Sequence, residues 1–389
     1  MSFLKLCENI EDSHTDINKH YDLLDIIFLA LFALFALFAL FTLFAVLSGA
    51  KGWKTIHIFG VAQLEWLREY LEFPNGIPTR HSTGQIIRGV KAESLLECCE
   101  QWVNTIRIKG EREQIAFDGK VIRVSGNGTS ISPQQLMSAM VVDSGLILYQ
   151  QEVSDKTNEV PVMQSMLRQL SVKGAIITAD TMYCQTHMAE MIRAEDADYM
   201  LQVKDNQRHL CKEITVFFHK TYRDSPEVLA KRHFEEIEKA HGRINERNYR
   251  LLPITYRLAG MTHWKDIQSV VEVTRKRTFK KKGKEQIEQE VSYYITSLGD
   301  DVKEAARAIR NNWAIETSQH WLLDVAFRED ESQIYAEDEA KNMALFRRPL
   351  PNLIKAHPLK DSVAGKMMRA GWGSQFRAEI LFGQKPTKV

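Results

Sequence analysis

Residues 173–204 read KGAIITADTMYCQTHMAEMIRAEDADYMLQVK, and this stretch decides the fold. Its first segment, KGAIITAD, is short, mostly apolar and ends in an acid, which is typical of a buried strand. The next segment, CQTHMAEMIRAE, predicts a helix, and ADYMLQVK predicts a second strand. A strand, a helix and a strand in this order predict a crossover unit with parallel strands.

The residues before this stretch predict three more strands and one more helix. IAFDGKVIRV, at 115–124, reads as a strand. Residues 135–153 predict two strands joined at Asp143-Ser144-Gly145, and 157–170 predict a helix. An antiparallel meander followed by crossover units is an α/β layout, with a mixed sheet and flanking helices.

The remaining regions differ in character from this sheet domain. Residues 205–290 are charged and mostly strand-like, so we interpret them as an insertion, and residues 300–327 predict one long amphipathic helix. The predicted organisation is a helical N-terminal domain (1–105), the first part of the core (106–204), a basic, mostly β insertion (205–290), a helix completing the core (291–330) and a helical C-terminal tail (331–389).

Composition constrains the environment more than the partners. The 389 residues include 51 basic and 50 acidic side chains, so the net charge indicates no partner class. The cysteines show no CxxC pair and no metal-ligand spacing, which favours free thiols in a reducing compartment: Cys7, Cys98, Cys99, Cys184 and Cys211. The acidic N-terminus has no basic region before the apolar run, so secretion is not expected.

A repeated tripeptide, LFALFALFALFTLFAVL at 31–47, lies within an uncharged run at 26–47. As a helix this run is about 33 Å long, and its Leu and Phe side chains cover every side. Such a helix is either deeply buried in protein or in lipid. Lys51 and Lys54 follow the run, so the rest of the chain is expected in the cytoplasm under either interpretation.

Three acids stand at places that suit chemistry. Asp118 interrupts an apolar strand, and Asp180 ends a buried strand, where ligands bind in open α/β sheets. Glu316 lies on the long helix, in a row with Arg310 and Asp324. Each has a structural alternative, namely a strand-end acid satisfied by backbone amides, a helix cap, and a solvated charged stripe.

Together these acids suit a two-metal site. Two strand-borne aspartates and a helix-borne glutamate supply the hard oxygen ligands that Mg²⁺ or Mn²⁺ prefers, and no His/Cys cluster indicates zinc. Two ions about 3.5–4 Å apart would activate an attacking water or 3′-hydroxyl and stabilise the leaving oxygen of a phosphoryl displacement.

At this point the chain resembles a known family. FDGKVIR, KGAIITADTMYCQ, DYMLQVKDNQ, HGRINER, ITSL, NNWAIETSQHWLLDVAFRED and NMALFRR are similar, in order and spacing, to segments of the H-repeat-associated insertion-sequence transposases of bacteria. The resemblance covers nearly the whole chain and implies a DDE transposase with an RNase H-like core. It places the catalytic, metal-holding triad on Asp118, Asp180 and Glu316, with two Mg²⁺ ions for which Mn²⁺ can substitute. It also implies DNA partners, namely the element's terminal repeats and target DNA, a homodimer in the synaptic complex, and a cytoplasmic, nucleoid-associated location.

Other matched residues have weaker roles, each with an alternative. In the insertion, His241, Arg243 and Arg247 either grip phosphates or form a structural ion-pair network with Glu246. Arg310 and His320 either position the scissile phosphate or pair with neighbouring acids. The remaining candidates for DNA contact are Lys204, Asn206 and Gln207, which turn formation explains almost as well, and a basic hairpin with Arg275, Lys276, Arg277, Lys280, Lys281 and Lys282, which is otherwise a solvated turn. Asp324 and Asp330 are candidates for supporting the ligands.

Two departures from the family pattern leave activity open. Removing residues 31–42 restores an ordinary apolar helix before Ser48-Gly49, so we interpret the repeat as a 12-residue expansion that disturbs the N-terminal domain. Pro349 and Pro351 fall where an unbroken helix is expected, at a cost of about 3 kcal/mol each inside a helix. The alternatives to an active transposase are an inactive relic that still binds DNA and a membrane-anchored protein with a nuclease-like domain.

Overall fold

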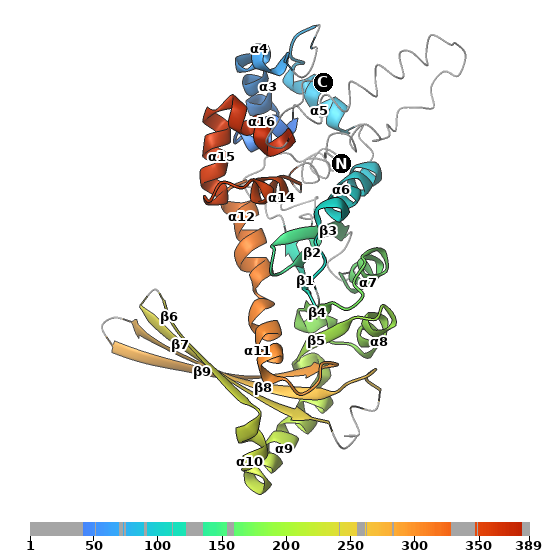
Figure 1. Cartoon of the computed structure of the whole chain (residues 1–389), viewed down its shortest axis with the longest axis vertical. Helices are drawn as coiled ribbons and strands as arrows, with labels where there is room; N and C mark the ends of the chain where they lie inside the picture. Colours follow the sequence, from blue (N-terminus) through green and yellow to red (C-terminus); the bar gives the residue numbers. More distant parts are fainter. Residues whose placement is uncertain are drawn as a thin grey trace, which may run out of the picture.

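The computed structural model describes most of the chain beyond the apolar repeat (Figure 1). The described residues are 42–50, 52–69, 73, 75–88, 92–110, 112–121, 135–153, 159–240, 242–254, 261, 263–281, 284–327, 347 and 349–382. Of the predicted site residues, His241, Lys282 and Asp330 lie outside these ranges, as do the side chains of Lys281 and His320.

The core is a mixed sheet whose strands follow the predicted order. The strands of this part are β1 (Gln114–Val121), β2 (Gln135–Val141), β3 (Leu146–Val153), β4 (Ile176–Ala179) and β5 (Asp198–Val203). β1 to β3 form an antiparallel meander, β4 pairs in parallel with β1, and β5 pairs in parallel with β4. The prediction of an α/β core is therefore confirmed.

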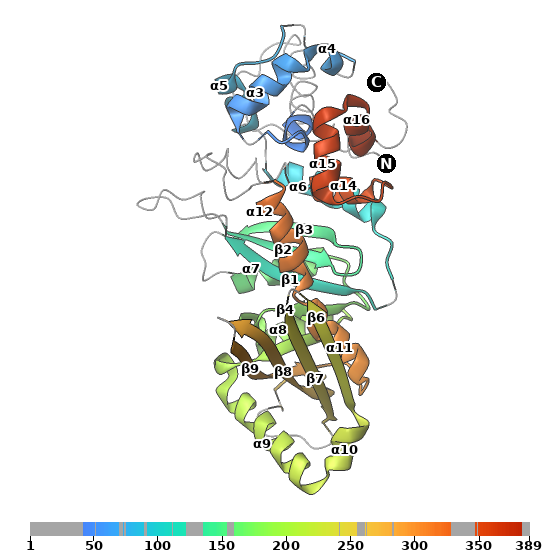
Figure 2. The same cartoon turned by 90° about the vertical axis from the view of Figure 1, so that its left-hand side faces the viewer.

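Helices cover both faces of this sheet. Helices α7 (Glu159–Gln169) and α8 (Thr186–Ala194) lie on one face, and α11 (Val302–Asn311) and α12 (Trp321–Val325) lie on the other (Figures 1 and 2). Strand alternation explains why. On β1, Phe117 faces the large core cluster with Met163 of α7, whereas its neighbour Ala116 packs with Ile315, just before Glu316.

The insertion extends the same sheet. Its strands β6 (His233–Ala240), β7 (Arg243–Pro253), β8 (Ser269–Lys281) and β9 (Lys284–Thr296) complete a nine-stranded order, β3-β2-β1-β4-β5-β9-β8-β7-β6. The end of β9 pairs antiparallel with β5, from Met200↔Thr296 to Val203↔Tyr293, while the other end projects from the core (Figure 1). The segment is also partly helical, because α9 (Arg208–Asp224) and α10 (Pro226–Lys231) precede β6.

The N-terminal and C-terminal helices form a joint module at one end of the molecule. It contains α3 (Trp53–Ala62), α4 (Leu64–Leu67), α5 (Arg80–Arg88), α6 (Ala92–Ile106), α14 (Pro349–Ala356), α15 (Val363–Trp372) and α16 (Ser374–Phe382). The described end of the apolar repeat, residues 42–47, is helical and buried there, with Phe44 edge-on to Trp66 at 4.7 Å. Within the described residues, no helix is long and apolar enough to cross a bilayer, and residues 26–41 lie outside them.

Pro349 and Pro351, where an interruption of a helix was expected, both lie in the helical residues of α14, and Arg347 before them is also helical. Residue 348 lies outside the described ranges. Asn352 then binds the backbone of Ile147 on edge strand β3 through both atoms of its amide, at 2.9 and 3.0 Å.

Candidate active site

Asp118 and Asp180 occupy adjacent positions on neighbouring parallel strands. β1 and β4 pair with Phe117 opposite Ala179, and each aspartate directly follows one of these two residues. Asp118 lies within β1, where its Oδ1 accepts a hydrogen bond from the N–H of Gly119 at 2.9 Å. Asp180 ends β4 and begins the 3₁₀ turn Thr181–Tyr183. The carboxyl ends of parallel strands meet at one edge, so the topology brings both acids there.

Glu316 reaches the same region from the other face of the sheet. The predicted single long helix is wrong here, because α11 ends at Asn311 and a π-helical turn, Ile315–His320, precedes α12. Glu316 is the second residue of this turn, and such turns are frequent at functional sites. The turn is tied to the sheet by Gln319, whose Nε2 donates to Ser138 Oγ of β2 at 3.1 Å.

The three carboxyl groups act on one another electrostatically. Burial raises the pKa of Asp118 to about 8, and the charges of Asp180 and Glu316 add to this increase. Burial also raises the pKa of Asp180, against the lowering effect of Lys204. The pKa of Glu316 is raised by burial and then by the charge of Asp180. Concentrated negative charge in a partly dry site favours a bound cation.

The carboxylate oxygens of Asp118, Asp180 and Glu316 are of the chemical type that binds a hard divalent cation. All three side chains offer carboxylate oxygens, the ligands preferred by Mg²⁺ and Mn²⁺. Across the described ranges, no three acidic, histidine or cysteine side chains are close enough together to hold an ion as they stand.

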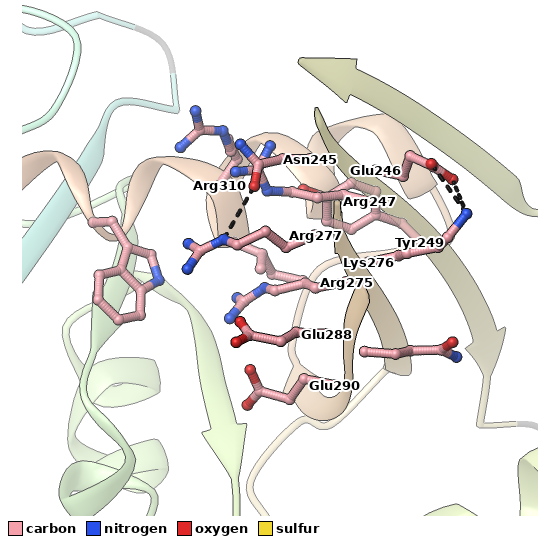
Figure 3. A pocket seen from close by; sticks show the side chains of 13 residues that line it. Asn245, Glu246, Arg247, Tyr249, Arg275, Lys276, Arg277, Glu288, Glu290 and Arg310 are labelled. Carbon is pink, nitrogen blue, oxygen red and sulfur yellow. Dashed lines mark hydrogen bonds and ion pairs between the residues drawn. The ribbon is translucent and has the colours of Figure 1, made fainter. Parts of the chain in front are cut away.

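A basic cleft opens beside this site, between the sheet of the insertion and the end of α11 (Figure 3). Its volume is about 440 Å³, and its walls come from β7, β8, β9 and α11. The residues that line it are Asn245, Glu246, Arg247, Tyr249, Arg275, Lys276, Arg277, Glu288, Gln289, Glu290, Ile309, Arg310 and Trp313. Trp313, which lines the cleft, is 48% exposed and stands three residues before Glu316 in the sequence.

The cations of the cleft are partly neutralised by acids. Glu238 of β6 accepts from Arg247 at 3.2 Å and from Arg310 at 3.1 Å through the same oxygen, which joins the insertion to α11. Lys276 pairs with Glu246 at 3.2 Å. Across the β8–β9 ladder, further glutamates stand opposite cations: Glu290 opposite Arg275, Glu288 opposite Arg277, and Glu285 opposite Lys280.

The sequence matches a known protein family along most of its length. Residues 109–348 match the family description "Transposase DDE domain", and residues 4–103 match the domain associated with it. The chain belongs to the DDE transposase family. The predicted resemblance and the RNase H-like fold class are therefore confirmed.

Curated relatives align along most of the transposase chain. It is 30% identical to "H repeat-associated putative transposase YhhI" of Escherichia coli (strain K12), over 87% of this chain and 89% of the relative. It is also 30% identical to "Putative transposase YncI" of Escherichia coli O157:H7, over 86% of each. A solved structure, "Cryo-EM structure of piggyBac transposase synaptic complex with hairpin DNA (SNHP)", aligns with a TM-score of 0.48 and 11% identity, over 99% of this chain and 82% of that one.

The remaining predicted residues of this transposase divide by location. Lys204 directly follows β5, and its positive charge lowers the pKa of Asp180. Asn206 and Gln207 bind the turn after Asp180, because their amides donate to the carbonyls of Thr181 at 2.8 Å and Cys184 at 3.0 Å. Arg243 and Lys280 lie on the projecting part of the insertion, outside the cleft, and Asp324 lies on α12.

Sequence reasoning overlooked a buried pair behind the two aspartates. Tyr183 donates its hydroxyl hydrogen to Glu159 Oε2 at 2.6 Å, and both side chains are buried. Glu159 is the first residue of α7, and Tyr183 ends the turn after Asp180. A signal was present in Gly119, because a glycine inside a strand often marks a close approach by another group.

Proposed function

We propose that Asp118, Asp180 and Glu316 hold two Mg²⁺ ions and carry out metal-dependent cleavage at the ends of the element. The observation that supports this most directly is the Phe117↔Ala179 pairing, which sets the two aspartates side by side at one sheet edge. The charge of Asp180 raises the pKa of both Asp118 and Glu316, and the charge of Glu316 raises the pKa of Asp118, which also supports the assignment. Mn²⁺ fits the same oxygen ligands.

Each residue of the proposed site has a distinct part. Asp118 lies on strand β1, and Asp180 directly follows β4, so both ligands are carried by the sheet. Glu316 comes from the opposite face on a turn anchored by Gln319. When bound, the two ions activate the attacking oxygen and stabilise the leaving oxygen of an in-line displacement. Hydrolysis would free a 3′-hydroxyl, which then attacks target DNA in the strand-transfer step.

The basic cleft is the proposed site for the DNA backbone beside the cut. Arg247, Arg275, Arg277 and Arg310 all line this cleft, as does Trp313 (Figure 3). Guanidinium groups bind phosphate in a planar, two-pronged geometry. Two DNA ends would require a homodimer, which we propose on the logic of pairing the terminal repeats, with nucleoid association as a consequence of DNA binding.

Nicking of supercoiled plasmid tests this function without knowledge of the element's ends. We expect the purified protein to nick DNA in Mg²⁺ or Mn²⁺ but not in EDTA, and we expect Asp118→Asn, Asp180→Asn and Glu316→Gln each to abolish nicking. Unchanged nicking in Asp118→Asn would refute the assignment. Salt-sensitive DNA binding without nicking in either metal would identify an inactive relic.

A further inference from the structure

A buried carboxylate stands directly behind the two aspartates, on the face of the sheet opposite Glu316. Glu159 is 8% exposed and lies at the start of α7. A Cβ atom added at Gly119 would lie 3.0 Å from Glu159 Oε1 and 3.2 Å from its Cδ, which is tighter than nine in ten real Cβ contacts. The carboxylate therefore packs against the backbone of the residue that follows Asp118.

The same carboxylate is bonded to the turn that follows Asp180. The Tyr183 hydroxyl donates to Glu159 Oε2 at 2.6 Å, and the Tyr183 N–H donates to the carbonyl of Asp180 at 3.0 Å. Tyr183 is 1% exposed and packs in the main core cluster. A continuous chain of contacts thus runs from the backbone at Asp118, through Glu159 and Tyr183, to the backbone at Asp180.

The sheet alone does not fix this geometry. The β1–β4 ladder ends at Phe117↔Ala179, so beyond this pair no ladder hydrogen bond holds the two aspartates in register. The Glu159–Tyr183 bond spans the two chain segments at the point where the ladder stops. A charge-assisted hydrogen bond in a dry site is short and directional, which suits it to hold a separation.

We propose that Glu159 and Tyr183 are positioning residues that set the spacing of Asp118 and Asp180 for metal binding. Gly119 permits this arrangement, because a side chain at that position would meet the Glu159 carboxylate. This inference rests on the proposed metal-dependent function of the same acids. Both side chains are buried behind the acids, so we expect their effect to be on metal affinity. Outer partners of metal ligands typically change affinity or activity by about 10- to 100-fold.

Two variants and a matched control test the proposal. Tyr183→Phe removes the bond, and Glu159→Gln keeps an acceptor for the hydroxyl but removes the charge. The control is Tyr222→Phe, because Tyr222 of α9 makes the same kind of bond, to Glu272 of β8, outside the proposed site and the basic cleft. Any general effect of losing a tyrosine–glutamate bond appears in the control as well.

The readouts are the Mg²⁺ concentration that gives half-maximal nicking and the rise in melting temperature on adding Mg²⁺. In Tyr183→Phe we expect the Mg²⁺ concentration for half-maximal nicking to increase about tenfold. At a fixed, sub-saturating Mg²⁺ concentration, the rise in melting temperature should be smaller than in the unmodified protein, and high Mg²⁺ should partly restore nicking and the rise in melting temperature. Glu159→Gln should move both readouts in the same direction. Tyr222→Phe should match the unmodified protein in both.

The outcomes separate this inference from the proposed function. If the unmodified protein responds to Mg²⁺ and Tyr183→Phe matches Tyr222→Phe in both readouts, the positioning role is overturned and the metal site stands. If the unmodified protein shows neither nicking nor a metal-dependent rise in melting temperature, the proposed function itself fails, and the positioning role fails with it.

Discussion

Lys120 and Asp324 form an ion pair, with 2.5 Å between Nζ and Oδ1, that joins β1 to α12. Lys120 stands two residues after Asp118, and Asp324 stands eight residues after Glu316. With the Gln319–Ser138 bond, this pair fixes the segment that carries Glu316 to the strands beneath it. The position of Glu316 relative to Asp118 therefore depends on two contacts between parts of the chain about 180 to 200 residues apart.

Breaking the Lys120–Asp324 ion pair should reduce activity even though Asp118, Asp180 and Glu316 are all kept. Lys120 is nearly buried, so Lys120→Met would leave Asp324 without this cation and release α12 from β1. We expect nicking to fall at least about tenfold, with destabilisation of about 1–3 kcal/mol since Asp324 is partly exposed. The control is Lys173→Met, which breaks the exposed pair with Asp196. Equal nicking by the two variants would contradict a positioning role for Lys120.

The raised pKa of Asp118 predicts an unusual dependence of stability on pH when no metal is present. The pKa of Asp118 rises from about 4 in the unfolded chain to about 8 in the fold, mainly because of burial. A group whose pKa is raised on folding contributes stability that is present below its unfolded pKa and is lost as pH rises towards its folded pKa. The contribution of Asp118 should therefore fall between about pH 4 and pH 8.

Asp118→Asn tests this dependence directly. In EDTA at pH 8 we expect the variant to melt a few degrees above the unmodified protein, with the gap closing towards pH 5. The exposed Asp143→Asn controls for the loss of a surface carboxylate. A pH-independent difference for Asp118→Asn would contradict the prediction. Saturating Mg²⁺ should reverse the order at pH 8, because the ion stabilises only the chain that keeps its ligand.

Local patterns predicted the strands of the core, but not the shape of the segment around Glu316. The strands have continuous apolar runs, so Asp118 within β1 and Asp180 directly after β4 stand out without any knowledge of distant contacts. The π-helical turn depends on Gln319 meeting Ser138, 181 residues away, so no local periodicity indicates it. Helix α9 was predictable, since Leu210, Ile214 and Phe218 are buried at four-residue spacing, but its many charges concealed the period.

The shared bonds of Glu238 predict opposite effects on DNA binding for two substitutions. Arg310→Met removes a cation from the cleft, whereas Glu238→Gln removes the acid that neutralises Arg247 and Arg310. We expect Arg310→Met to weaken binding to duplex DNA and to reduce the salt slope by about one, and Glu238→Gln to strengthen binding at low salt. Fluorescence anisotropy over a range of salt concentrations measures both. The control is Arg223→Met, on α9 away from the cleft. If Arg310→Met and Arg223→Met show the same salt slope of DNA binding, Arg310 does not contact the DNA.

Arg377 predicts that the C-terminal helices hold the N-terminal helices in place. Its buried guanidinium lies 4.7 Å from the ring centre of Trp66 and 4.9 Å from that of Phe59. It also donates to the carbonyl of Ala370 at 2.8 Å and to Gln63 at 3.3 Å. Burial lowers the pKa of Arg377 to about 10, so it remains charged at neutral pH and keeps both kinds of contact.

Replacing this arginine should loosen the module rather than the catalytic core. Arg377→Met keeps most of the volume but leaves buried carbonyls without their donor, so we expect a loss of about 2–4 kcal/mol and faster proteolysis at the described N-terminal helices. Arg377→Lys keeps the charge but not the planar donor geometry, and should fall in between. Limited proteolysis with mass spectrometry locates the first cuts. The contrary outcome is that Arg377→Met is cut first in the projecting strands β6 to β9, while its N-terminal helices stay as protected as in the unmodified protein. That result would show that Arg377 does not join the two ends of the chain.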